Sequence, residues 1–218
     1  MISLDIQRRR IVLPTQLQGL ITGASERRVL RRELDRQLLP QLGYSEALAL
    51  TISEPTLKHM VTKYSEQLVF HPVNEIRHWF TYQSGAYIEP GYPPLYYGRA
   101  RNKVLSPNKS AVAAVGEAIA GFLAQRLYRS RKLSRPNHDC PDIVMEADNG
   151  TLLVEAKATL KTAHAIKEKI DGEIPGMARL VISARLLDRR PVLGLLVGTF
   201  LRSETEYYAC LTEVANAV

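Results

Sequence analysis

The sequence predicts an α/β protein whose C-terminal half follows the order α-β-β-α-β-β, preceded by a mostly helical N-terminal extension. Three observations lead to this prediction. Residues 110–129 carry apolar side chains at helical spacing, Asn149 and Gly150 separate two short apolar segments, and residues 192–200 form a continuous apolar run typical of a buried strand. We therefore expect an N-terminal helical or loop region over residues 1–105 and a second domain over residues 106–218.

The N-terminal region has two helical patterns and one segment rich in turn residues. Ser25 is a suitable N-cap for a helix over residues 26–39, which Pro40 would end. A second helix is expected over residues 54–69, where apolar side chains recur every three or four residues. Residues 79–98 combine tyrosines with glycines and prolines, which is typical of a loop.

The C-terminal half can be divided more sharply. After the helix over residues 110–129 comes a basic loop over residues 129–135. Two strands, 142–147 and 151–158, are joined by the Asn-Gly pair, a strong hairpin signal. The expected elements that follow are a helix over residues 163–170 and strands over residues 179–184 and 192–200.

Charge is distributed unevenly along the chain. The net charge is +7, and residues 1–135 hold 20 Lys and Arg against 10 Asp and Glu, whereas residues 136–218 hold 9 against 12. A basic first part suits a polyanion such as nucleic acid, and an acidic second part suits a cation site. A solvated basic surface is the alternative explanation.

Cysteine usage and hydropathy narrow the class of protein. Cys140 and Cys210 lie far apart and belong to no CxxC motif, which argues against a disulfide framework or a structural zinc site. The first residues lack the pattern of a secretory signal, and the apolar stretch 191–201 is too short to span a bilayer. We expect a cytoplasmic protein without a membrane partner.

The hairpin places a set of charged side chains on one face. If Asn149 and Gly150 are the central turn residues, Asp142 lies opposite Lys157. One face then carries Asp142, Glu155 and Lys157, and the other is uniformly apolar and belongs to the core. Half-buried hairpins commonly have a solvated polar face, so this arrangement alone does not establish a site.

The motif formed by Pro141-Asp142 and Glu155-Ala156-Lys157 resembles the signature of the PD-(D/E)xK nuclease superfamily, over roughly residues 110–200. The resemblance implies a restriction-endonuclease-like fold in which Asp142 and Glu155 bind Mg²⁺, for which Mn²⁺ can substitute. It assigns the carbonyl of Ala156 as a further ligand and Lys157 as the group that orients or activates the attacking water. Magnesium prefers oxygen ligands and lowers the pKa of bound water, which suits these residue types. Asp139 is the competing choice for Asp142.

A fourth acid is expected from the preceding helix. Glu117 is the single acid in the body of that helix, and the residues around it are small, which allows close packing on a sheet. Many members of the superfamily place a metal-binding glutamate here, so the resemblance implies the same role for Glu117. A surface glutamate is the structural alternative.

Basic residues suggest where nucleic acid would bind. The candidates for phosphate contacts lie after the tyrosine-rich segment and in the basic loop: Arg99, Arg101, Arg129, Arg131, Lys132 and Arg135. The leading hypothesis is a magnesium-dependent DNA endonuclease, with DNA preferred to RNA and with phage defence, restriction or a mobile element as settings by analogy. The alternative is a catalytically inactive, nuclease-like subunit that binds nucleic acid or scaffolds a complex. A protein partner or a homo-oligomer is compatible with both.

Overall fold

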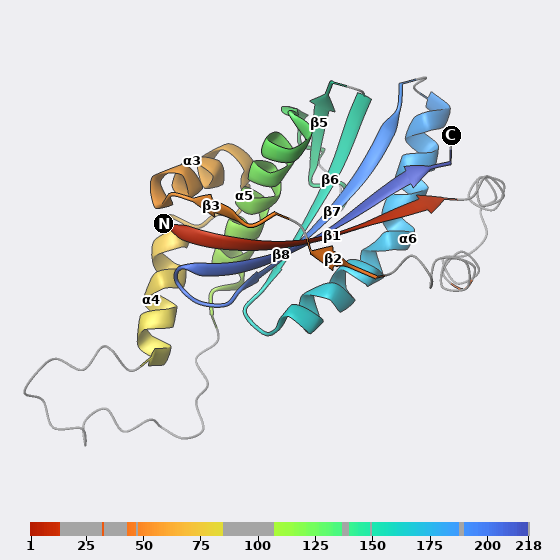
Figure 1. Cartoon of the computed structure of the whole chain (residues 1–218). Coiled ribbons are helices and arrows are strands. Elements are labelled where there is room, and N and C mark those ends of the chain that lie inside the picture. The colour runs from red at the N-terminus through yellow and green to blue at the C-terminus, as the bar shows by residue number, and fades with distance from the viewer. Residues whose placement is uncertain are drawn as a thin grey trace, which may run out of the picture.

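The computed structural model describes residues 1–13, 32, 43–46, 48–84, 107–136, 140–148, 150–187 and 190–217. These residues form one mixed α/β arrangement of strands and helices (Figure 1). The elements are β1 (Ile2–Leu13), β2 (Ser45–Glu46), β3 (Leu50–Ile52), α3 (Glu54–Tyr64), α4 (Pro72–Ser84), α5 (Lys109–Tyr128), β4 (Arg131–Ser134), β5 (Ile143–Ala147), β6 (Gly150–Thr159), α6 (Ala163–Leu187), β7 (Val192–Leu201) and β8 (Glu206–Asn216).

The strands form a single eight-stranded mixed sheet in the order β2-β1-β8-β7-β6-β5-β4, with β3 also pairing with β1. The pairs β1–β8 and β6–β7 are parallel, and the other pairs are antiparallel. Helix α6 connects the parallel strands β6 and β7, as a crossover between parallel strands requires. The α/β class predicted from the sequence is therefore confirmed.

Helices cover both faces of this sheet (Figure 1). Helix α5 packs on one face together with α3 and α4, and α6 packs on the other. Each face has its own apolar core: Ile143, Met145 and Val154 join the core under α5, whereas Leu153 joins the core under α6. The hairpin β5–β6 thus alternates between the two faces as predicted. Its apolar face belongs to the core under α5, and Leu153, on the face that carries Glu155, packs in the core under α6.

The first strand was not predicted. Residues 2–13 form β1, which pairs with β8 from Ser3–Glu206 to Leu13–Asn216. The expectation of a helical or loop region is therefore wrong for these residues, and the sheet draws on both sides of the boundary expected at residue 105. The signal that was missed is the alternation of buried and exposed residues, in which Ile2, Leu4 and Ile6 belong to the core.

The second helix of the C-terminal half is much longer than predicted. Helix α6 extends from Ala163 to Leu187 and contains Pro175, so the strand expected over residues 179–184 is wrong. Met177, Ala178, Val181 and Ile182 are all buried against the core under α6. This spacing is helical, and tertiary packing outweighs the breaking tendency of glycine and proline in the middle of the segment.

The hairpin has a different register from the predicted one. Ala147 pairs with Gly150, and the printed ladder ends with Ile143 opposite Val154. Continuing this ladder by one residue puts Asp142 opposite Glu155, not opposite Lys157. The shift is by two residues, so every side chain keeps its predicted face.

Gly150 explains the error in register. Its φ is +143°, and a Cβ at this position would lie 2.1 Å from the carbonyl oxygen of Pro191. The glycine is required by the close approach of Pro191, whose oxygen accepts a hydrogen bond from the N–H of Thr151 at 2.9 Å. Gly150 therefore begins β6 instead of occupying the centre of the turn.

Several smaller expectations also change. Helix α3 begins at Glu54, as expected, but ends at Tyr64 rather than at residue 69. Residues 79–84, expected in a loop, belong to α4, and the expected basic loop contains β4. Strand β8 was not predicted. The helix expected over residues 26–39 lies outside the described residues except at Arg32, which is helical. None of the described helices has the length and apolar character needed to cross a membrane.

Close packing of α5 predicts which glycines tolerate a side chain. A Cβ at Gly121 would lie 2.3 Å from the ring of the fully buried Tyr64, whereas a Cβ at Gly172 would meet nothing within 4 Å. Gly121→Ala is expected to lower the free energy of unfolding by about 1–3 kcal/mol through overpacking. Gly172→Ala, the matched helical control, is expected to raise it by about 0.5–1 kcal/mol. Denaturant unfolding measures both, and equal effects of the two substitutions would contradict the packing described.

Candidate functional site

The structure brings Asp142, Glu155 and Lys157 together where β5 begins and β6 approaches its end. Asp142 lies immediately before β5, and its Oδ2 accepts a hydrogen bond from the backbone N–H of Ala156 at 2.7 Å. Lys157 Nζ donates to Glu155 Oε1 at 2.6 Å. The three side chains predicted to share a face are thus linked through the backbone and side chains of β6.

Glu155 is a carboxylate without access to solvent. The residue is 0% exposed, and its Oε2 accepts no hydrogen bond from any N–H or O–H group of the described residues. The Cys140 thiol lies close to it: burial, together with the charge of Glu155 and a hydrogen bond to it, raises the pKa of Cys140. A buried carboxylate oxygen that lacks a partner is costly, and such groups are found where a ligand or ion completes the site.

The pKa of the Asp142 carboxyl is raised above its usual value. Burial and the neighbouring charge of Glu155 raise its pKa to about 6, with a smaller contribution in the same direction from Glu117. The hydrogen bond from Ala156 and the charge of Lys157 act in the opposite direction. Asp142 is therefore close to other carboxylates, and a cation placed among them would relieve their repulsion.

Lys157 stays protonated at neutral pH. Burial by itself would lower its pKa, but the hydrogen bond and charge of Glu155 and the charge of Glu173 outweigh it, and the pKa of Lys157 is raised. Glu173 Oε1 lies 3.5 Å from Lys157 Nζ. The side chain of Lys157 is 32% exposed, so it can reach a ligand while it remains a cation.

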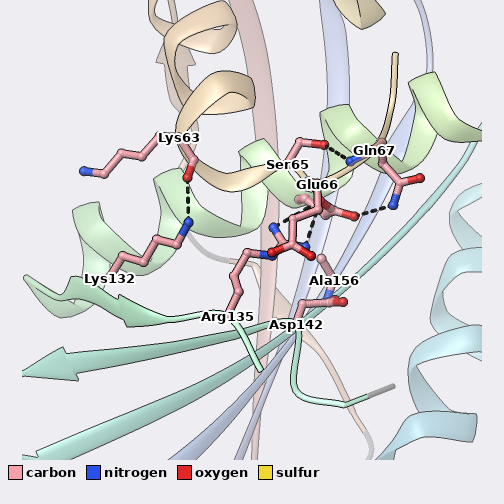
Figure 2. A network of polar contacts seen from close by, with 9 residues as sticks. Lys63, Ser65, Glu66, Gln67, Lys132, Arg135, Asp142 and Ala156 are labelled. Carbon is pink, nitrogen blue, oxygen red and sulfur yellow. Dashed lines mark hydrogen bonds and ion pairs between the residues drawn. The ribbon is translucent and has the colours of Figure 1, made fainter. Parts of the chain in front are cut away.

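Glu117 is held by a network of its own (Figure 2). Its carboxylate accepts hydrogen bonds from Gln67 Nε2 at 2.9 Å, from the backbone N–H of Glu66 at 3.1 Å and from Arg135 at 3.2 Å. Figure 2 shows Glu66, Gln67 and Arg135 near Asp142 and Ala156. Glu117 is thus near the site, as predicted, but its oxygens serve to anchor the segment after α3. Its role as a metal ligand stays a prediction.

The predicted basic residues that the structure describes differ in exposure and in their partners. Arg135 has a side chain only 10% exposed and pairs with Glu66 and Glu117, so it belongs to the site's internal network. Arg131 is 77% exposed and pairs with Glu146, and Lys132 Nζ donates to the carbonyl of Lys63 at 2.9 Å. Arg129 lies at the end of α5, and Arg99 and Arg101 lie outside the described residues.

The described residues supply two carboxylates that could bind a magnesium ion. No group of three or more His, Cys, Asp and Glu side chains suited to holding a metal occurs in the described part of the chain. Magnesium, however, is usually bound through one or two carboxylates, with water and substrate phosphate completing its shell. Asp142 and Glu155 supply two carboxylates, and the partnerless Oε2 of Glu155 is the donor atom that such an ion would use.

Some neighbours of the site were not found from the sequence. Glu173 was missed because the helix over residues 163–170 was expected to end before it. Gln67 and Glu66 come from the segment after α3, where a continued helix was expected. Cys140 lies one residue before the motif, and nothing in its spacing pointed to Glu155. Comparison with protein families, with curated proteins and with solved structures finds no match for this chain.

Because the pKa of Asp142 is raised, replacing its carboxyl group by a neutral amide should stabilise the folded protein, and the size of this effect should depend on pH. The folded protein binds this proton more tightly than the unfolded chain, so the contribution of Asp142 to stability becomes unfavourable as the pH rises from about 4 through 6. Asp142→Asn should raise the free energy of unfolding by about 1–3 kcal/mol at neutral pH, since one pKa unit equals about 1.4 kcal/mol. The gain should vanish near pH 4.

Denaturant unfolding at both pH values, without divalent cations, measures this effect. Asp148→Asn is the matched control, because Asp148 is exposed at the turn of the same hairpin. A gain from Asp142→Asn that does not depend on pH, or an equal gain from the control, would show that the pKa of Asp142 is not raised in the folded protein.

The Arg135–Glu117 pair predicts a structural rather than a phosphate-binding role for Arg135. Arg135→Met should lower the free energy of unfolding by about 3 kcal/mol, because it leaves Glu117 as a buried charge without its cation. Adding Glu117→Gln should recover most of that loss. Arg131→Met, at an exposed ion pair, should change stability by less than about 1 kcal/mol. An unchanged stability of Arg135→Met, with weaker DNA binding, would instead support the phosphate contact.

Proposed function

We propose that this protein is a metal-dependent nuclease that hydrolyses backbone phosphodiesters of DNA. The observation that carries the proposal is a pair of carboxylates that repel each other, the fully buried Glu155 on β6 and the partly buried Asp142 just before β5, with the protonated Lys157 beside them. Two carboxylates and an amine in this arrangement are suited to a magnesium ion and a phosphate.

The arrangement of elements supports the same proposal. Helix α5 precedes the hairpin β5–β6, and α6 leads from β6 to the parallel strand β7. This is the order that the resemblance to the PD-(D/E)xK superfamily implies, with the carboxylates at the end of the hairpin away from its turn. A restriction-endonuclease-like fold is therefore part of the proposal.

Each residue has a defined part in the proposed reaction. A bound Mg²⁺ would supply charge to polarise the phosphate and to lower the pKa of a water. Asp142 and Glu155 would hold it, with the carbonyl of Ala156 as a further ligand. Lys157, whose pKa is raised by Glu155 and Glu173, donates a hydrogen bond to the attacking water and stabilises charge that develops on the phosphate. Glu117 would position the segment after α3 beside the substrate.

A cleavage assay tests the function. Wild type should cut plasmid or single-stranded DNA with Mg²⁺ or Mn²⁺ and lose activity with a chelator. Asp142→Asn, Glu155→Gln and Lys157→Met should each lower the rate by about 100-fold or more, as expected for groups that stabilise a transition state. Glu146→Gln is the matched control, since Glu146 shares the β5–β6 hairpin but pairs with Arg131 near the turn.

The outcomes separate the two hypotheses. Equal cleavage by wild type and all variants would exclude the proposed site. If neither wild type nor any variant cleaves DNA but all of them still bind it, the non-catalytic, nucleic-acid-binding alternative is favoured. RNA of the same sequence, included in parallel, decides the type of nucleic acid.

A further inference from the structure

Lys157 has two carboxylate neighbours that belong to different elements. Its Nζ donates to Glu155 Oε1, on the same strand β6, at 2.6 Å, and it lies 3.5 Å from Glu173 Oε1 on α6. The first distance is that of a charge-assisted hydrogen bond, and the second is longer than such a bond. The ammonium group is therefore bound to Glu155, and a short movement would bring it to Glu173.

The two carboxylates differ in their access to water. The side chain of Glu155 is 1% exposed, whereas the side chain of Glu173 is 37% exposed. A buried carboxylate requires a cation beside it, and a partly exposed carboxylate can be solvated instead. In the structure, Lys157 is thus the cation that compensates the charge of Glu155, while Glu173 keeps a partly solvated charge close to the same amine.

A divalent cation at Glu155 would compete with Lys157. The Oε2 atom of Glu155 is buried, has no hydrogen-bond partner among the described residues, and is the donor atom available to a metal. A metal on Oε2 and the ammonium group on Oε1 would share one carboxylate, and two positive charges so close together repel each other strongly where little water screens them. The flexible stem of a lysine allows its amine to move away, and Glu173 is a second carboxylate within ion-pair distance.

The charges of the group are consistent with such an exchange. Asp142, Glu155 and Glu173 together carry three negative charges when they are ionised. Lys157 supplies one positive charge, so two negative charges remain. One divalent cation would therefore bring the group to neutrality, provided that the amine stays in the group with a carboxylate of its own. Glu173 is placed to be that carboxylate.

We propose that Glu173 is a positioning residue to which Lys157 moves from Glu155 when a divalent metal binds. The amine stays protonated and exchanges one carboxylate for the other, and no covalent bond forms or breaks. Held from α6, Lys157 is released from Glu155 and can direct its N–H groups to water and phosphate. This inference rests on the proposed function, because it requires a metal at Asp142 and Glu155.

Calorimetric titration of the full chain with Mn²⁺, in the absence of nucleic acid, tests the exchange. Glu173→Gln should weaken Mn²⁺ binding about fivefold, which is the scale of a partly exposed ion pair, because Lys157 loses the carboxylate to which it moves. Lys157→Met should strengthen Mn²⁺ binding, because the metal no longer competes with the amine for Glu155. In the Lys157→Met background, adding Glu173→Gln should weaken Mn²⁺ binding by less than about twofold, since the two residues act together.

Glu168→Gln is the matched control. It removes the same charge from an exposed position of α6, where Glu168 pairs with His164, and it should bind Mn²⁺ as wild type does. Thermal unfolding without metal shows whether each variant is folded. If Lys157→Met does not fold, Lys157→Gln replaces it in the titrations, because its neutral amide can still donate a hydrogen bond to Glu155.

The outcomes distinguish this inference from the proposed function. Absence of Mn²⁺ binding by wild type at millimolar concentration would overturn both. Binding that Asp142→Asn abolishes and that Glu173→Gln leaves unchanged would support the metal site and overturn the exchange. Equal weakening by Glu173→Gln with and without the amine of Lys157 would also overturn it, because Glu173 would then act on the metal directly. Equal weakening by Glu168→Gln would reduce the effect to the overall charge of α6 and overturn it as well.

Discussion

A charged carboxylate in a dry position is the constraint around which the β5–β6 end of the molecule is organised. Glu155 belongs to a strand that is paired on both sides and covered on both faces, so its charge cannot reach water. A low-dielectric surrounding makes such a charge costly unless cations or donors compensate for it. Lys157 provides that compensation from the same strand, and Glu173 then stabilises the amine from α6. Asp142 is itself largely removed from water and lies near the charge of Glu155, and for these two reasons its pKa is raised.

The sequence was informative where local pattern and final packing agree. The helix α5, the two strands of the hairpin, the strand β7 and the division of the hairpin into two faces all follow from periodicity, and the structure confirms them. Prediction failed where partners are distant in sequence. Among the arginines of β1, Arg8 and Arg10 have exposed side chains, whereas Arg9 is buried. Arg9 packs on the ring of Tyr44 and bonds to Thr212 and Asp171, all of them distant in sequence. The glycines and the proline of α6 locally favour the end of a helix, but the buried side chains that follow them pack against the core and keep the segment helical.

In the candidate site, too, the features set by local pattern could be predicted, whereas the contacts between distant segments could not. Asp142, Glu155, Lys157 and Glu117 could be predicted to approach one another, because alternation along strands and small residues on a helix are visible locally. The partners of Glu117 could not, since Gln67 lies 50 residues and Arg135 lies 18 residues away from it. The register of the hairpin depended on the carbonyl of Pro191, which no pattern near Gly150 reveals.

The parallel pairing of β1 with β8 has a consequence for how the chain reaches its folded state. Ser3 and Glu206 are neighbours in the sheet although they are separated by more than two hundred positions. Contacts of such long range slow folding, because closing the intervening loop costs entropy before any pairing compensates for it. During synthesis β1 leaves the ribosome before β8, and the edge of β1 that pairs with β8 stays unpaired until β8 has emerged. That interval exposes a strand competent to pair with another chain, so assembly of this sheet is an expected point of chaperone dependence and of aggregation.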